Sequence, residues 1–139
     1  LRAKSALKGP LRVRVTPMPE SNHRYTLLVL DNLQDLAGSP NVLAHMLSTI
    51  ESTLGEDLGQ LKQHTAAQRI QALGEKLHAF KGYIPMMCQP AMGDRLVAVE
   101  ALARDQNTRA LWGSDQLSRL LQDLDTLHQE IQAAAAGQG

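Results

Sequence analysis

The apolar residues between positions 70 and 87 recur at helical spacing. Intervals of three and four residues alternate along one series, which consists of Ile70, Leu73, Leu77, Phe80, Ile84 and Met87. On an α-helix such a series forms one buried face. Hydrophobic residues make up 43% of the chain but aromatic residues only 3%, so the core must consist mainly of aliphatic side chains. This composition favours packed helices over a β-sandwich, and we predict an all-α fold.

Further helices are predicted on both sides of this series. Ser39-Pro40 is typical of a helix start, with a capping hydroxyl before a proline at the first helical position. Pro90 is expected to begin another helix, because proline interrupts any helix that already contains it. Ser114 is expected to cap the last one. The three apolar faces would comprise Leu43, Met46, Leu47, Ile50, Leu54, Leu58 and Leu61 in the first, Met92, Leu96, Val99 and Leu102 in the second, and Leu117, Leu120, Leu121, Leu124, Leu127 and Ile131 in the third.

The ends of the helix that contains His78 are predicted from its neighbours. Thr65 is a candidate N-cap, and Pro85 and Pro90 should end or kink the helix near residues 84–87. Four amphipathic helices joined by short loops bury their apolar faces most economically side by side. We therefore predict an antiparallel four-helix bundle over residues 33–135, followed by a flexible tail over residues 136–139.

Residues 1–32 have a different pattern. The run Leu11-Arg12-Val13-Arg14-Val15 alternates apolar and charged side chains, as a half-exposed strand does, and Tyr25 to Leu30 is a second β-rich run. The simplest interpretation is an N-terminal β-hairpin or a linker. The two runs resemble the last strands of a PAS-type sensor domain, which would make this segment the remnant of a preceding sensor domain.

Charge and cysteine content argue against several classes of function. The chain has 14 basic and 14 acidic residues, and no basic face stands out in its main body, which argues against nucleic-acid binding. Cys88 is the single cysteine, so we expect neither disulfides nor a thiolate metal site. No apolar run approaches the roughly 20 residues that span a bilayer. We expect a cytoplasmic monomer. No metal site is expected either, because no pair among the remaining histidines has ligand spacing: His23, His45, His64 and His128.

His78 is expected to lie on the solvent-facing side of its helix. At about 100° per residue, it points roughly 120° away from the centre of the apolar face. Gly74 and Gly82, at i−4 and i+4, place no side chains beside the imidazole. Each glycine costs on the order of 1 kcal/mol relative to alanine inside a helix, which suggests a requirement for access to His78. Close packing of two helices is the alternative explanation. An accessible imidazole with Lys81 one turn further on is suited to a phosphoryl group.

His78, Lys81 and Gly82 match a His-x-x-Lys-Gly motif. With the order of the expected helices, this motif resembles the histidine-containing phosphotransfer (HPt) domain of phosphorelays and hybrid sensor kinases. The resemblance covers roughly residues 33–135, about three quarters of the chain. It implies that His78 accepts a phosphoryl group from an aspartyl phosphate and passes it on. The donor would be a response-regulator receiver domain, in another protein or in the same parent chain.

The residue types suit this chemistry. An imidazole with its ordinary pKa of about 6.5 is a nucleophile near pH 7. Lys81 would offset charge on the transferring oxygens, and Gly82 would leave room for the acidic pocket of the receiver with its magnesium ion. The chain would need no cofactor of its own, because phosphoryl transfer is largely positioning and charge stabilisation. The partner would dock on residues around His78, for which the candidates are Gln71, Gly74, Tyr83, Pro85 and Met86.

The sequence also departs from the pattern of this family. Many members have small residues just after the Lys-Gly pair and another glycine six positions further on, where this chain has Tyr83 to Met86 and then Cys88. These departures leave open a second interpretation, in which the scaffold has lost phosphotransfer and serves as a protein-docking or dimerisation module. A self-phosphorylating kinase is not expected, because Ala79 follows His78 where kinase dimerisation helices carry an acidic residue, and no nucleotide-binding motif is present.

Overall fold

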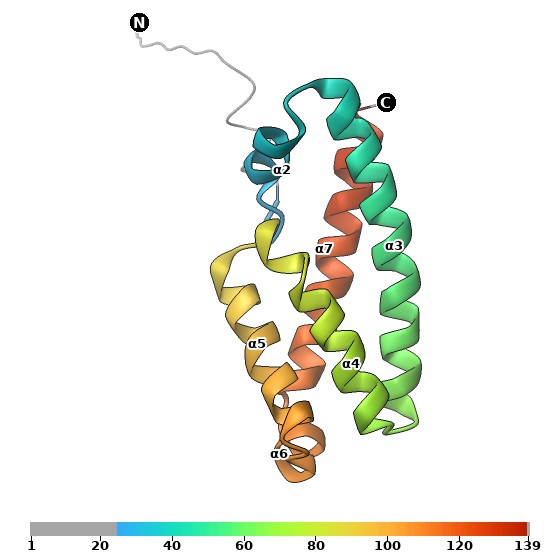
Figure 1. The fold of residues 1–139 in the computed structure, drawn as a ribbon, viewed down its shortest axis with the longest axis vertical. Coiled ribbons are helices and arrows are strands. Elements are labelled where there is room, and N and C mark those ends of the chain that lie inside the picture. The colour runs from blue at the N-terminus through green and yellow to red at the C-terminus, as the bar shows by residue number, and fades with distance from the viewer. Residues whose placement is uncertain (1–24, 139) are drawn as a thin grey trace, which may run out of the picture.

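The computed structural model describes residues 25–138, and the predicted all-α fold is confirmed for them. This part of the chain contains six α-helices, one short 3-10 helix and no strand (Figure 1). The elements are α2 (Leu30–Ala37), α3 (Pro40–Ala66), α4 (Ile70–Lys81), η1 (Ile84–Met86), α5 (Pro90–Arg104), α6 (Thr108–Gly113) and α7 (Gln116–Gln138). Within residues 25–138, no helix is both long and apolar enough to cross a lipid bilayer.

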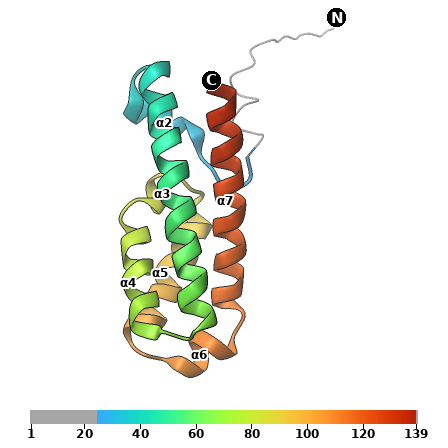
Figure 2. The same ribbon diagram turned by 90° about the vertical axis from the view of Figure 1, so that its right-hand side faces the viewer.

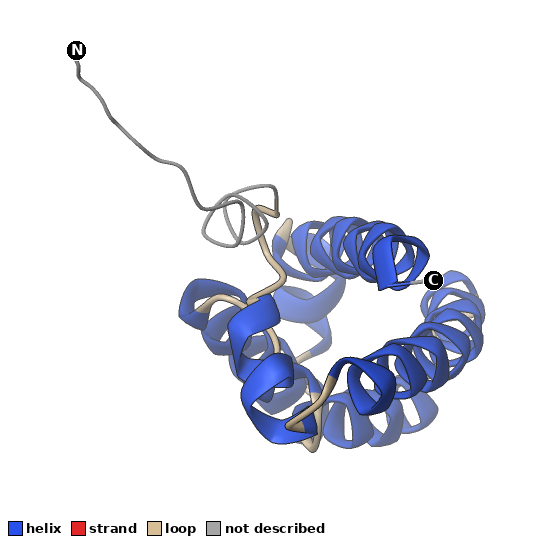
Figure 3. Ribbon diagram, turned by 90° about the horizontal axis from the view of Figure 1, so that it is seen from above, coloured by secondary structure: helices blue, strands red, loops and turns tan. Residues whose placement is uncertain are grey.

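Helices α3, α4, α5 and α7 pack around one core. Each contacts two others, because α4 lies between α3 and α5, and α7 packs against both α3 and α5. Followed along the chain, each of the four runs back past the one before it (Figure 1, Figure 2). Viewed from above, the helices surround a common centre (Figure 3). α6 lies at the end where α5 meets α7, and α2 lies near the opposite end.

The apolar series at residues 70–87 forms part of this core as predicted. Five of its six members are fully buried, and only Ile70 at the start of α4 remains partly exposed. The faces predicted for the other long helices supply most of the remaining core, which includes Leu43, Leu47, Leu54, Leu58, Leu61, Met92, Leu96, Val99, Leu117, Leu120, Leu124, Leu127 and Ile131.

Of the four predicted helix starts, those at Pro40 and Pro90 are confirmed and the one at Thr65 is wrong. The fourth, Ser114, lies two residues before α7, and its hydroxyl accepts a hydrogen bond from the Gln116 N–H at 3.4 Å. α3 begins at Pro40, and the Ser39 hydroxyl accepts a hydrogen bond from the Val42 N–H at 3.3 Å. α5 begins at Pro90. Thr65, in contrast, does not cap the next helix, because it lies in the last turn of α3 and its hydroxyl donates to the Leu61 carbonyl at 2.8 Å.

α4 ends at Lys81, slightly before the predicted break. Pro85 contributes to this end, because it has no N–H to donate to the Lys81 carbonyl four residues earlier. The chain continues as η1, whose Ile84 is buried, and Met87 immediately after η1 is buried too. The apolar series therefore continues past the α-helix through a tighter turn.

The segment before α2 contacts the bundle in its described part. Tyr25–Val29 is joined by an isolated antiparallel bridge, Leu28 to Cys88, to the chain between η1 and α5. Leu30, predicted as strand, begins α2. The first strand of the proposed hairpin, residues 11–15, lies outside the described residues, so the hairpin stays a prediction. Leu28, Leu30 and Leu33 are buried in the same core as the long helices. At the other end, α7 extends to Gln138, through most of the expected tail.

Candidate functional site

His78 lies near the end of α4 with its side chain 73% exposed, as the helical spacing predicts. Its neighbours in the sequence explain this position. Leu77 and Phe80 are fully buried in the core, whereas Ala79 is exposed. The helix is thus fixed by its apolar face, and the imidazole is presented on the other side.

A carboxylate that the sequence analysis did not identify faces His78 from α5. Glu100 has a side chain only 5% exposed, and it is the one buried charged residue in the part of the chain that the structure describes. Its Oε2 lies 3.9 Å from the His78 Nδ1. The signal was present in the sequence, because Glu100 interrupts the apolar face of its helix between Leu96 and Ala103.

Two cations compensate the burial of Glu100. Its Oε1 accepts hydrogen bonds from the Lys81 Nζ at 3.1 Å and from the Arg104 Nη1 at 3.0 Å. A buried carboxylate needs such partners, since losing its hydration without them costs several kcal/mol. Lys81 remains 30% exposed and Arg104 58% exposed, so both also reach the solvent beside His78. The lysine of the motif is therefore a partner of a buried acid as well as a surface charge.

The position of Glu100 also affects the two ring nitrogens of His78. A separation of 3.9 Å is too long for a hydrogen bond, and the contact is ionic only when the imidazole is protonated. A negative charge near Nδ1 favours the tautomer that carries its proton there, and this tautomer leaves the lone pair on Nε2. The arrangement thus favours Nε2 as the nucleophilic atom of an exposed imidazole.

A cavity of about 460 Å³ opens between α4 and α5 next to His78. Two predicted docking residues, Gln71 and Gly74, line it, together with Arg104 from the facing helix. Gly74 also has the alternative role considered for it, close packing of two helices. A Cβ atom at this position would lie 3.3 Å from the Cβ of Ala103, so the missing side chain lets α4 and α5 approach each other.

Gly82 and Tyr83 follow Lys81 at the end of the helix. Gly82 is exposed, and its N–H donates to the Ala79 carbonyl at 3.0 Å. The Tyr83 side chain turns toward α3, where its hydroxyl donates to the Asp57 Oδ2 at 3.3 Å. Burial and the neighbouring Asp57 carboxylate raise the pKa of Tyr83. Lys76 pairs with the other oxygen of Asp57 at 3.2 Å. Tyr83 is thus half-buried and bonded within the molecule, while Pro85 and Met86 in η1 are exposed.

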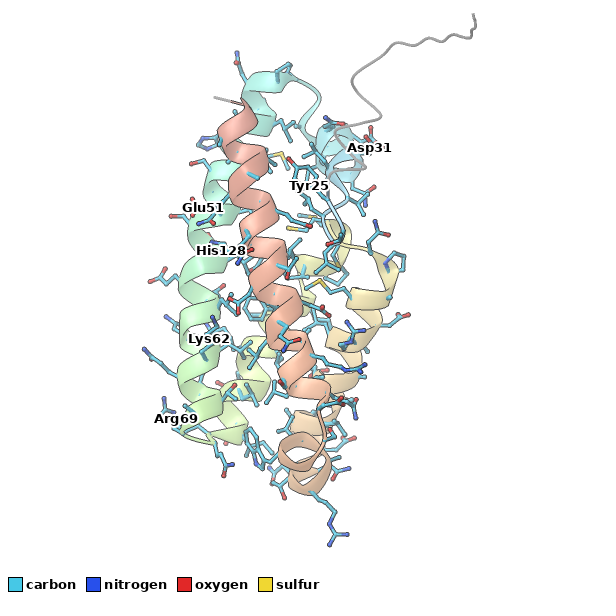
Figure 4. The ribbon with its side chains drawn as sticks, turned by 180° about the vertical axis from the view of Figure 1, so that it is seen from behind. Tyr25, Asp31, Glu51, Lys62, Arg69 and His128 are labelled. Carbon is cyan, nitrogen blue, oxygen red and sulfur yellow. The ribbon has the colours of Figure 1, made fainter. Side chains whose placement is uncertain are left out.

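A second histidine lies at a different contact, away from α4. His128 on α7 points toward Glu51 on α3 (Figure 4), and its Nε2 is 3.0 Å from the Glu51 backbone carbonyl oxygen. Further along the same pair of helices, Lys62 and Asp125 form an ion pair at 2.8 Å. These contacts join α3 to α7.

Among residues 25–138, no three His, Cys, Asp or Glu side chains are grouped so that they could hold a metal ion.

Comparison of the chain with models of protein families, with curated proteins and with solved structures finds no match in any of the three.

Proposed function

We propose that this protein is a phosphorelay intermediate, in which His78 accepts a phosphoryl group from a receiver-domain aspartate and passes it on. The proposal takes α3, α4, α5 and α7 as an antiparallel four-helix bundle of the HPt type. One observation carries it, namely an exposed imidazole whose Nδ1 faces a buried carboxylate. An ordinary surface histidine has no need of such a partner, and the desolvation of Glu100 has a cost that positioning of His78 would explain.

In the proposed transfer, the His78 Nε2 attacks the phosphorus atom of the aspartyl phosphate. A P–N bond forms while the P–O bond to the aspartate breaks, and the aspartate carboxylate leaves with the bonding electrons. The imidazole becomes positively charged as the bond forms, and its Nδ1 proton stays on the ring. The Glu100 carboxylate, 3.9 Å away, stabilises that positive charge without moving. Transfer to the next receiver reverses the same steps.

Lys81 and Arg104 would act on the negative charge of the transferring phosphoryl group. Both share the Glu100 Oε1 and both reach solvent, so they can approach the phosphoryl oxygens from the side of α5. Because each is held by a buried carboxylate, little side-chain freedom remains to be lost when the partner docks. The magnesium ion of the reaction belongs to the receiver.

The test uses two phosphoryl donors with wild-type protein, His78→Gln and a control variant, His45→Gln. One donor is phosphoramidate, a small molecule that needs no docking surface, and the other is a phosphorylated receiver domain. His45 is an exposed histidine on α3. We expect an acid-labile, base-stable label on wild type and His45→Gln and none on His78→Gln, with all three folded by circular dichroism. Undiminished labelling of His78→Gln would rule out this site.

The exposed η1 segment favours one alternative function, a docking module without phosphotransfer. Met86 is one of only a few large exposed apolar side chains in residues 25–138, and it lies on the segment that departs from the family pattern. In this case, binding of a partner would be unaffected by His78→Gln and weakened by Met86→Gln. Partner binding that is weakened by His78→Gln and unaffected by Met86→Gln would rule out this docking function.

A further inference from the structure

Glu130 on α7 holds the segment before α2 through four hydrogen bonds. Its Oε2 accepts from the Thr26 backbone N–H at 2.7 Å and from the Thr26 hydroxyl at 2.9 Å. Its Oε1 accepts from the Leu27 N–H at 3.0 Å and from the Leu28 N–H at 2.9 Å. Three consecutive amides thus converge on one carboxylate, an arrangement that binds anions well. We call Glu130 with residues 26–28 the Glu130 clamp.

The clamped segment is bonded in turn to the chain that follows the His78 helix. The Val29 N–H donates to the Met87 carbonyl at 2.8 Å, and the Gln89 N–H donates to the Leu27 carbonyl at 2.8 Å. Asn32 adds a side-chain bond from its Nδ2 to the Met86 carbonyl at 3.0 Å. Residues 26–32 therefore connect α7 to the stretch between α4 and α5 (Figure 2).

η1 depends on this connection because its own hydrogen bonding is sparse. It is a single 3-10 turn, closed by one bond from the Met87 N–H to the Ile84 carbonyl at 3.0 Å. Such a turn has little stability alone. Ile84 and Met87 anchor it in the core, whereas Pro85 and Met86 are exposed seven and eight residues after His78.

We propose that Glu130 is a positioning residue for partner docking: the Glu130 clamp holds η1 in place, so that Pro85 and Met86 form part of the surface on which the receiver docks beside His78. This inference rests on the proposed phosphotransfer function. It assigns a role in recognition to a residue that touches neither His78 nor η1 and that lies 52 positions after His78 in the sequence.

The variant Glu130→Gln tests the clamp with little change in size. Each carboxylate oxygen accepts two hydrogen bonds, so either orientation of a glutamine amide turns an NH₂ group toward N–H donors. Glu56→Gln is the matched control, since it removes the same charge from an exposed position on α3. Thr26→Val is a milder second variant, which removes only the hydroxyl bond and retains the three backbone amides.

Three measurements are made on each folded variant. Hydrogen exchange measures the protection of the Val29 and Gln89 amides. Phosphoramidate labelling measures the intrinsic reactivity of His78. The rate of transfer from a phosphorylated receiver is measured as a function of receiver concentration. For Glu130→Gln we expect faster exchange of both amides and unchanged phosphoramidate labelling. The half-saturating receiver concentration should rise by about tenfold at an unchanged maximal rate. Thr26→Val should change amide exchange and the half-saturating concentration in the same direction but by less. Glu56→Gln should match wild type in both.

Two results would overturn the inference, and they can be told apart. Faster exchange at Val29 and Gln89 with an unchanged half-saturating concentration would make the clamp purely structural. A wild-type protein that neither donor labels would refute the proposed function itself, and with it any role of the clamp in docking.

Discussion

Replacing Gln68 by glycine is predicted to stabilise the protein, because this residue ends α3 in a backbone conformation that favours glycine. The Arg69 N–H donates to the His64 carbonyl at 2.9 Å and the Gln68 N–H to the Thr65 carbonyl at 3.1 Å. Together these bonds form a Schellman motif, which requires left-handed backbone at the position of Gln68. Its φ angle is 53°.

The size of the effect follows from two opposing contributions. Left-handed backbone costs a residue with a Cβ atom roughly 1–2 kcal/mol. Glycine avoids this cost, but it loses more conformational freedom on folding, roughly 0.5–1 kcal/mol. The net gain in the free energy of unfolding should be about 0.5–1 kcal/mol, which corresponds to a rise in Tm of roughly 2–4 °C for a chain of this size.

Alanine at the same position separates the backbone effect from the loss of the side chain. Gln68→Ala retains the Cβ atom and the strain, so urea and thermal unfolding should rank Gln68→Gly above both Gln68→Ala and wild type. Gln106, with a φ angle of 54°, ends α5 in the same motif, in which the Asn107 N–H donates to the Leu102 carbonyl at 2.9 Å. Glycine and alanine substitutions at Gln106 therefore repeat the test independently. The reasoning is refuted if glycine is no more stabilising than alanine at both positions.

Two other predictions concern single polar contacts. Burial opposes the ionisation of Glu130, but hydrogen bonds from three backbone N–H groups and one hydroxyl outweigh it and hold its pKa below the ordinary 4.5. A lowered carboxylate pKa stabilises the fold above the unfolded value, and this stability is lost as the pH falls through the folded value. The urea midpoints of wild type and Glu130→Gln should therefore converge below about pH 4; a constant gap down to pH 3 would contradict the sign. Tyr83→Phe should lower the free energy of unfolding by about 1 kcal/mol, because it removes the 3.3 Å bond to Asp57 and keeps the ring; an unchanged urea midpoint at neutral pH would count against that bond.

The sequence predicts those parts of this fold that depend on local rules. The spacing of Leu73, Leu77 and Phe80 identifies a buried helical face because one turn of helix has a fixed length. Pro40 and Pro90 mark helix starts because a missing N–H costs nothing at that position. These signals need no knowledge of which helix packs against which. The exposure of His78 follows from the same periodicity.

Contacts between distant residues could not be predicted in this way. The amides held by Glu130 precede it by 102 to 104 positions, and no local pattern at Thr26 or Glu130 announces the pairing. Gln68 is a similar case at short range. Helix ends of its kind are usually marked by glycine. This chain forms the motif at the expense of strain, so its sequence gives no glycine signal at the end of α3.

Glu100 and Glu130 together indicate how much a buried or half-buried acidic residue can reveal. Glu100 projects from a face that packs on the core and Glu130 is half-buried, and groups from elsewhere in the fold meet each of them: two cations and an imidazole in one case, a row of backbone amides in the other. Replacement of Glu100 by leucine would remove the desolvation cost of this buried carboxylate, so stability alone does not account for its presence. Under the proposed function, the partner of Glu100 that gains is His78, the residue whose motif first suggested phosphotransfer. The partner of Glu130 is the segment bonded to the chain between α4 and α5, and under the same proposal both acids would act on the surface on which the receiver docks.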